Sequence, residues 1–333
     1  MIPYSSHNMR DKLSPKNVIL LIFVCLFPLL TYGTDFIVQS LSAREVFLPI
    51  PSGDYILRIL VQAYLYMMLA VGLNIVPGLT GLLDLGYVGF YLVGGYTAGL
   101  LMARLGWSYW IALPLAAING AIWGLLRGAP TLRLTGDYFA IVTFGFSELL
   151  FRIVKNEEWL IGGPNGFVTN IPAPTLFGHE LYQYWQQYYH ILILLILAMA
   201  VAYRLQNSRV GRAWAAIRED ERAAESMGIN LREYKSLAFA VSAAIGAIGG
   251  AFFAQFQVNI SASAFEFWES ILILCMIVLG GMGSIKGSIL GAAILGSLGE
   301  ILRPFGGARY LIFGIILILM MRFRPAGLLS VRR

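Results

Sequence analysis

Charged side chains are concentrated in one short stretch of an otherwise apolar chain. Residues 204–235 hold seven Arg or Lys and five Asp or Glu residues, although charged residues make up only 13% of the 333-residue sequence. Apolar segments long enough to cross a membrane lie on both sides of this stretch. A charged, Ala-rich, helix-forming insert between two membrane spans indicates a surface that binds a soluble partner.

The residue order within the insert predicts an amphipathic helix over residues 211–228, then a turn and a second helix. Five residues at alternating steps of four and three would share one helix face: Val210, Trp214, Ile217, Glu221 and Ala224. Four of the five are apolar, which favours a stripe that fits a groove on the partner. Gly228 stands where a helix end favours a left-handed residue. Asn230 and Glu233 are spaced as a capping box that begins the next helix.

A second group of candidates consists of charged residues inside apolar segments. Such charges are expensive in lipid and therefore point to function or pairing. Asp84 follows a Pro77–Gly78 helix-ending pair, so we expect a broken segment near residues 78–90 that includes Gly78, Gly81 and Gly86. Broken helices in transporters occur where the backbone lines a cavity. Asp84 either lines a path or makes a structural hydrogen bond at the break, and we favour the bond.

The other intramembrane charges have simpler interpretations. Asp137 stands at an expected helix start, where a carboxylate can accept hydrogen bonds from free N–H groups. Glu148 and Arg152 are four residues apart on one expected helix and can pair with each other.

Composition determines the fold class. Hydrophobic residues make up 58% of the sequence and mean hydropathy is +0.71, whereas soluble domains contain about 25% charged residues. The apolar runs are continuous and do not alternate, which favours helices over a β-barrel. We therefore predict an all-α, polytopic transmembrane bundle of about ten spans: 17–33, 55–77, 82–104, 109–127, 135–155, 188–206, 236–256, 265–283, 287–304 and 308–322.

The positive residues predict the orientation. With both termini in the cytoplasm, 17 of the 24 Lys and Arg residues, Arg127 among them, lie on the cytoplasmic side or its flanks. This assignment puts residues 204–235 in the cytoplasm. It also makes residues 156–187 the longest external loop, with a turn at Gly162–Gly166. The expected organisation is one transmembrane domain over residues 1–333, with an anchor helix and external loop at 17–54 and a core at 55–328.

Several kinds of motif are absent from the sequence. There is no phosphate-binding loop of the type that cradles ATP, no Ser/His/Asp order, and no His or Cys spacing of a metal site. We therefore expect no enzyme activity, no cofactor, no metal and no nucleic-acid partner.

Five stretches together resemble the M-type permease subunit of bacterial branched-chain amino acid ABC importers. They are Gly78–Phe90, Arg133–Thr143, Gly162–Gly166, Gly211–Asn230 and Ile277–Ser284. The spacing Arg222-Ala223-Ala224-x-x-x-Gly228 is similar to the loop by which ABC importer permeases bind their ATPases. That loop often has Glu where this chain has Arg222.

The resemblance implies a bacterial inner-membrane complex with a second homologous permease, two ABC ATPase subunits and an external substrate-binding protein. It implies leucine, isoleucine and valine as substrates. The ATPase-binding residues would come from the charged loop: Trp214, Glu219, Asp220, Glu221, Arg222, Ala223, Ala224 and Gly228. Urea and short-chain amide importers use similar permeases and form the alternative. A stand-alone secondary transporter, driven by protons or sodium, would not need the charged loop.

Overall fold

The computed structural model describes most of the chain beyond residue 52. The described residues are 26–28, 31, 53–131, 134, 136–158, 167–176, 178–302, 306–323 and 327–329. They fall into two compact units, residues 1–60 and residues 61–333. The expected span at 17–33 lies almost entirely outside the described residues, and the turn at Gly162–Gly166 lies wholly outside them.

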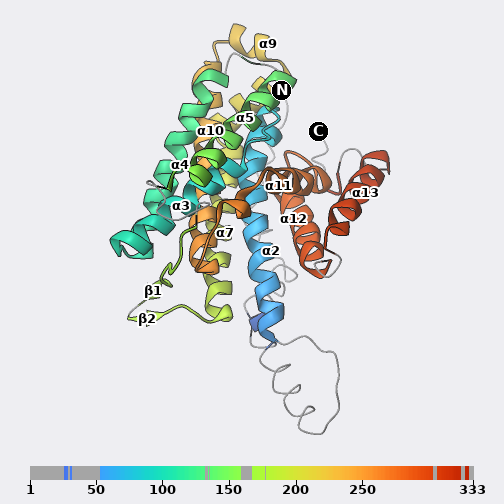
Figure 1. The fold of residues 1–333 in the computed structure, drawn as a ribbon. Helices are drawn as coiled ribbons and strands as arrows, with labels where there is room; N and C mark the ends of the chain where they lie inside the picture. The colour runs from blue at the N-terminus through green and yellow to red at the C-terminus, as the bar shows by residue number, and fades with distance from the viewer. Residues whose placement is uncertain are drawn as a thin grey trace. The chain divides into compact units, whose positions relative to one another are not determined.

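Helices dominate the described residues, which confirms the all-α prediction (Figure 1). The helices, including the π-helix η2 and the 3₁₀ helix η4, are α2 (Gly53–Asn74), η2 (Ile75–Thr80), α3 (Val88–Leu105), α4 (Tyr109–Thr131), α5 (Asp137–Asn156), α7 (Tyr184–Gln206), α8 (Arg209–Glu219), α9 (Glu221–Ser226), α10 (Leu231–Gln257), η4 (Ala262–Phe265), α11 (Phe267–Gly280), α12 (Ile285–Ile301) and α13 (Ala308–Phe323). One short antiparallel ribbon, β1 (Thr175–Leu176) with β2 (His179–Glu180), interrupts the expected external loop.

The expected count of about ten spans is not confirmed. In the described part of the chain, six segments are long and apolar enough to cross a membrane: 53–80, 88–105, 109–131, 184–206, 231–257 and 262–280. Helix α5 carries four charged residues, and helices α12 and α13 are only 17 and 16 residues long. These three helices therefore fall short of the length or composition of a simple span.

Helices α3, α4 and α10 pack against one another within residues 61–333, and Figure 1 shows them side by side. Glycine permits this approach at two positions. A Cβ on Gly94 of α3 would lie 2.0 Å from the Ala247 carbonyl oxygen, and a Cβ on Gly250 of α10 would lie 2.0 Å from the Tyr91 carbonyl oxygen. Small residues at such crossings let helix backbones pack closely inside a membrane.

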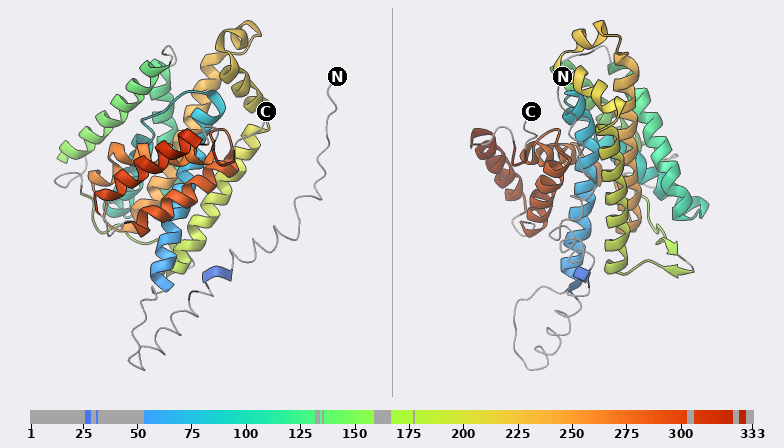
Figure 2. Two further views of the ribbon diagram at one scale, coloured as in Figure 1. Left: turned by 90° about the vertical axis from the view of Figure 1, so that its right-hand side faces the viewer. Right: turned by 180° about the vertical axis from the view of Figure 1, so that it is seen from behind.

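The C-terminal helices lie on the other side of this unit from α4. Helices α11 and α12 pack against each other, and α13 packs on α11. Both Figure 1 and the rear view in Figure 2 show α12 and α13 at the side opposite α4. The segment 167–171 is paired with residues 258–260, since Val168 and Ile260 exchange backbone hydrogen bonds of 3.0 and 2.9 Å. The chain between α5 and α7 is thus fastened to the end of α10.

Candidate functional site

The first feature of the site is the helix break, which confirms the predicted interruption near residues 78–90. Helix α2 continues directly into the π-helix η2, a rare geometry that is frequent at functional sites. Pro77 lies within η2 and has no N–H to donate. Gly81 then takes a left-handed conformation with φ +79°, and regular helix resumes only at Val88. The break contains all four predicted residues: Gly78, Gly81, Asp84 and Gly86.

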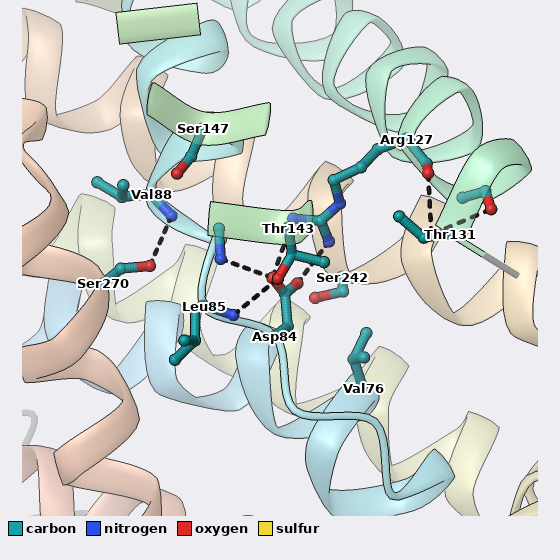
Figure 3. Close-up of polar contacts among 12 residues, drawn as sticks. Val76, Asp84, Leu85, Val88, Arg127, Thr131, Thr143, Ser147, Ser242 and Ser270 are labelled. Atoms are coloured by element: carbon teal, nitrogen blue, oxygen red, sulfur yellow. Dashed lines mark hydrogen bonds and ion pairs between the residues drawn. The ribbon is translucent and has the colours of Figure 1, made fainter. Parts of the chain in front are cut away.

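Asp84 lies in the non-helical part of the break and forms a buried ion pair with Arg127 of α4 (Figure 3). Arg127 Nη1 donates to Asp84 Oδ1 at 3.0 Å, and Nη2 donates to Oδ2 at 2.5 Å. Both side chains are 0% exposed. The Gly86 N–H also donates to Asp84 Oδ1, at 2.9 Å. The carboxylate therefore has both an ionic partner and a local backbone partner.

The guanidinium of Arg127 also lies between aromatic rings. Its Cζ is 4.1 Å from the ring centroid of Phe90 and 5.4 Å from that of Phe239. Cation–π attraction of this kind strengthens where water is excluded. The sequence does not predict this role, because Arg127 stands at the cytoplasmic end of the span expected at 109–127. Helix α4 instead continues to Thr131. The available signal was the need of any intramembrane charge for a partner.

Side chains from two other helices hold the backbone of the break (Figure 3). The Leu85 N–H donates to Thr143 Oγ1 of α5 at 3.2 Å, and the Val88 N–H donates to Ser270 Oγ of α11 at 3.3 Å. A Cβ on Gly86 would lie only 1.9 Å from the Thr143 carbonyl oxygen, so a larger residue does not fit there. Side chains therefore accept hydrogen bonds from three N–H groups in or next to the break, those of Leu85, Gly86 and Val88.

The second feature is the charged segment between α7 and α10. The structure corrects the expectation of one helix over residues 211–228, because two helices, α8 and α9, meet at Asp220. Asp220 Oδ1 accepts hydrogen bonds from the N–H groups of Arg222 at 2.8 Å and Ala223 at 3.0 Å. Such a cap satisfies the first N–H groups of α9 and takes Asp220 out of helical geometry.

Helix α9 ends as the sequence predicts. Gly228 has φ +84°, the Gly228 N–H donates to the Glu225 carbonyl at 2.9 Å, and the Ile229 N–H donates to the Ala224 carbonyl at 3.1 Å. This pair of bonds is a Schellman motif. Asn230 caps α10, since Asn230 Oδ1 accepts from the Glu233 N–H at 3.4 Å. The return half of the predicted capping box is replaced by an Asn230 Nδ2 to Glu233 Oε1 bond of 2.8 Å.

The apolar stripe of the segment faces the protein's own helices, which corrects the expectation that it fits a partner's groove. Trp214, Ile217 and Ala224 are buried. Trp214 Nε1 donates to the Tyr234 carbonyl in the first turn of α10, at 2.7 Å. Glu221, expected on the same stripe, pairs with the buried Lys235 at 2.7 Å. These contacts fasten α8 and α9 to the start of α10.

The outward side of α8 and α9 remains open to solvent. Its exposed residues include five of the predicted partner-binding residues: Glu219, Asp220, Arg222, Ala223 and Gly228. Met227, next to Gly228, is 83% exposed. A hollow of about 500 Å³ adjoins the end of α9 and is lined in part by Glu225, Asn230 and Arg232. Trp214, Glu221 and Ala224, in contrast, point toward the bundle or pair within it.

The two features meet directly at Arg218, in the last turn of α8. Arg218 Nη1 donates to the Gly78 carbonyl in the helix break. A Gly-rich turn that follows α11 also contacts the broken helix. Its Gly283 N–H donates to Oδ1 of Asn74, the last residue of α2, at 2.9 Å. Gln206 Nε2 at the end of α7 donates to the Gly283 carbonyl at 3.3 Å. The charged segment is thus hydrogen-bonded to the broken helix.

The remaining predicted charges lie away from this junction. Asp137 is the first residue of α5, but Gly136 occupies the capping position and Asp137 makes no cap, which corrects the expectation. Glu148 and Arg152 form the predicted pair, with Arg152 Nε 2.7 Å from Glu148 Oε1. Among the described residues, no group of three or more His, Cys, Asp or Glu side chains could hold a metal ion.

The chain is similar in sequence to known transport proteins. Residues 55–321 match the family described as branched-chain amino acid transport system / permease component. The chain is 41% identical over 292 residues to the high-affinity branched-chain amino acid transport system permease protein LivM of Escherichia coli strain K12, a match that covers 81% of this chain and 68% of that protein.

The matches to more distant relatives cover nearly the whole length of those proteins. The probable branched-chain amino acid transport permease protein LivM of Methanocaldococcus jannaschii is 28% identical over 327 residues, covering 84% of this chain and 94% of that protein. The permease protein LivH of the Escherichia coli K12 system is 26% identical over 298 residues, covering 80% of this chain and 91% of that protein. No solved structure matches the chain.

Proposed function

This chain belongs to the family of branched-chain amino acid transport system permease components, and we propose that it is the permease subunit of an ATP-driven importer of leucine, isoleucine and valine. Six apolar helices in the part of the chain that the structure describes make it a multi-pass membrane protein. The proposed substrate class is that of the transport systems to which similar proteins belong, among them the LivM and LivH permease proteins.

The observation that carries the mechanism is the hydrogen bond from Arg218 to the Gly78 carbonyl. Arg218 belongs to the surface segment α8, and Gly78 belongs to the irregular backbone of the helix break. A displacement of α8 would therefore act on η2 without an intervening element. Irregular backbone at membrane depth is either buried in protein or lines a cavity, and broken helices form the substrate sites of many transporters. We therefore place the transport path beside the break, so that the Arg218 contact joins the docking surface to this path.

The proposed partners bind at the exposed α8 and α9 surface, beside the transport path and on the external side. The exposed side of α8 and α9 is the docking surface for an ATPase subunit, and two ATPases serve the permease pair. A second homologous permease completes the path, since both LivM and LivH proteins of one Escherichia coli strain match this chain. A substrate-binding protein delivers the amino acid to the external side, near residues 156–187. Both termini lie in the cytoplasm, where the positive residues concentrate.

Transport proceeds by alternating access. ATP binding closes the ATPase pair, and the bound helices α8 and α9 move with it. They move as one unit because both are capped and both are fastened to the start of α10. Arg218 transmits this movement to the helix break, and the path between the two permeases changes the side to which it is open. Hydrolysis of ATP then resets the complex.

Uptake measurements test the proposal. Cells that lack this chain should lose high-affinity uptake of labelled leucine, isoleucine and valine, and a plasmid copy should restore it. Uptake should fail when cellular ATP is depleted and persist when proton and sodium gradients are collapsed. Restoration of labelled urea or acetamide uptake alone would favour the amide importer. Uptake that follows the ion gradients would favour a secondary transporter.

A further inference from the structure

Helix α5 differs in composition from the neighbouring helices that cross the membrane. It is 20 residues long but is not among the six apolar spans, and its charged residues are Asp137, Glu148, Arg152 and Lys155. Two of them, Glu148 and Arg152, lie in the interior of the helix on its outward side. This composition does not suit a helix that faces lipid.

The contacts of α5 place this outward charge alongside membrane-spanning segments. Phe146 packs against Trp123 in the interior of α4, with ring centroids 5.9 Å apart. A Cβ on Gly89, in the first turn of α3, would lie 3.2 Å from Ser147. Glu148 is therefore level with residues of two apolar spans, and Arg152 is one turn further along the same helix.

The ion pair is exposed between an apolar stretch of α5 and the polar last turn of the helix, where Lys155 and Asn156 are also exposed. The side chain of Arg152 is 64% exposed and that of Glu148 is 32% exposed, although they lie 2.7 Å apart. The exposed neighbours are Ile141, Leu149 and Ile153. Gly145, in the middle of this face, has open space where a Cβ would project. The face thus combines apolar surface, a small residue and a polar pair.

Helix α7 has an exposed face that is wholly apolar in its middle part, as expected of a surface that faces lipid. The exposed side chains in the middle of α7 are Ile193, Ile196 and Leu197, with no charged residue among them. Hydrocarbon solvates such a surface but cannot solvate an exposed carboxylate and guanidinium. The surface of another protein, in contrast, can supply both apolar contacts and hydrogen-bond partners to the α5 face.

We propose that the outward face of α5, formed by Ile141, Gly145, Glu148, Leu149 and Arg152, is the surface that binds the second, homologous permease subunit. This inference rests on the proposed function, which requires such a subunit. The open position at Gly145 lets a partner helix approach closely, and the spare hydrogen-bonding capacity of Arg152 is met across the interface. Residues 17–33 of this chain are less suited to cover this face, because they contain no charged side chain to complement the Glu148–Arg152 pair.

Site-directed photo-cross-linking in native membranes tests the surface. In a background carrying Cys25→Ala and Cys275→Ala, Leu149→Cys on α5 and Ile196→Cys on α7 are each labelled with benzophenone maleimide and irradiated. Mass spectrometry of the products should show Leu149→Cys attached to the second permease and Ile196→Cys attached to lipid. Attachment of Leu149→Cys to lipid only, to a second copy of this chain, or to residues 1–52 of the same chain would overturn the proposal.

A substitution pair gives an independent measurement. Gly145→Phe should lower the amount of second permease that co-purifies by about tenfold, while Ala200→Phe, at an exposed position on α7, should leave it unchanged. Equal co-purification of both variants, at equal yields of the chain, would overturn the assignment of the α5 face. Uptake of labelled leucine by unsubstituted cells, measured in parallel, tests the proposed function separately, since a cross-link to a permease can form whatever substrate the pair carries.

Discussion

Asp84 and Arg127 are 43 residues apart in the sequence, yet they form a bidentate ion pair in which neither side chain reaches solvent. The carboxylate belongs to the helix break, and the guanidinium comes from α4 and lies over Phe90. A charge that is removed from water in this way depends on its partner, because no solvent can replace it. The pair therefore fixes the break against α4, and it explains how a carboxylate persists there.

Loss of either partner should destabilise the protein more than loss of both. We expect Asp84→Leu or Arg127→Leu to lower the free energy of unfolding by about 3–5 kcal/mol and to abolish uptake, since each leaves a buried charge uncompensated. The double variant should be more stable than either single one. The measurement is thermal unfolding of the purified chain in detergent together with leucine uptake. Additive losses in the double variant would show that the two residues act independently.

Asp84→Asn separates the charge of this side chain from its capacity to accept hydrogen bonds. The amide oxygen can still accept from the Gly86 N–H, but it no longer neutralises Arg127. We therefore expect Asp84→Asn to lose uptake nearly as fully as Asp84→Leu. Retention of uptake in Asp84→Asn would show that transport requires the hydrogen bonds that Asp84 accepts and not its charge.

The sequence predicts the features of this protein that depend on local order. The Pro77–Gly78 pair and the glycines after it suffice to predict a broken helix, and Gly228 suffices to predict the end of α9. The partner of Asp84 could not be predicted, because it depends on how α4 approaches the break in space. The side that Trp214 faces was also beyond prediction, since an apolar stripe fits the chain's own bundle as well as a partner.

Composition gave the span count less reliably than the fold class. Helix α5 is apolar enough to be expected as a span, but its charges and its contacts along α4 suit a helix between protein surfaces. Asp220 likewise ends α8 by a side-chain bond that competes with helix geometry. Charged side chains thus make α5 unsuited to a simple membrane span, and Asp220 divides the single helix expected over residues 211–228 into α8 and α9.

Arg218 should be needed for coupling more than for folding. Arg218→Met removes the bond to the Gly78 carbonyl, and a bond from a charged donor contributes about 1.5–3 kcal/mol. We expect leucine imported per ATP hydrolysed to fall about tenfold in proteoliposomes that contain the assembled complex. Arg204→Met, at an exposed arginine of α7, is the matched control. Equal coupling in both variants would remove the Arg218 contact from the mechanism.

Gly228 should be intolerant of a β-branched residue because of its backbone conformation. No atom lies within 4 Å of a Cβ placed there, so the cost of Gly228→Val is strain at φ +84°, about 1–3 kcal/mol. We expect weaker binding of the ATPase at unchanged membrane insertion. Gly106→Val introduces the same strain, at φ +64°, at the far end of α3. A matching loss of ATPase binding in Gly106→Val would show a general stability effect.

The Glu221–Lys235 pair should respond asymmetrically to substitution, because its two members differ in burial. The side chain of Lys235 is 2% exposed, whereas that of Glu221 is 31% exposed. Lys235→Met leaves a carboxylate that water can still reach, and the new side chain suits the buried position. Glu221→Leu instead leaves an ammonium group buried without its partner, which costs considerably more. We therefore expect Glu221→Leu to lower the unfolding temperature further than Lys235→Met, and to release α9 from α10 so that the ATPase no longer co-purifies.

Differential scanning fluorimetry of the detergent-purified variants measures the first effect, and co-purification measures the second. If Lys235→Met proved the more damaging change, the pair would not be the fastening between α9 and α10, and the lysine would have to act through some other contact.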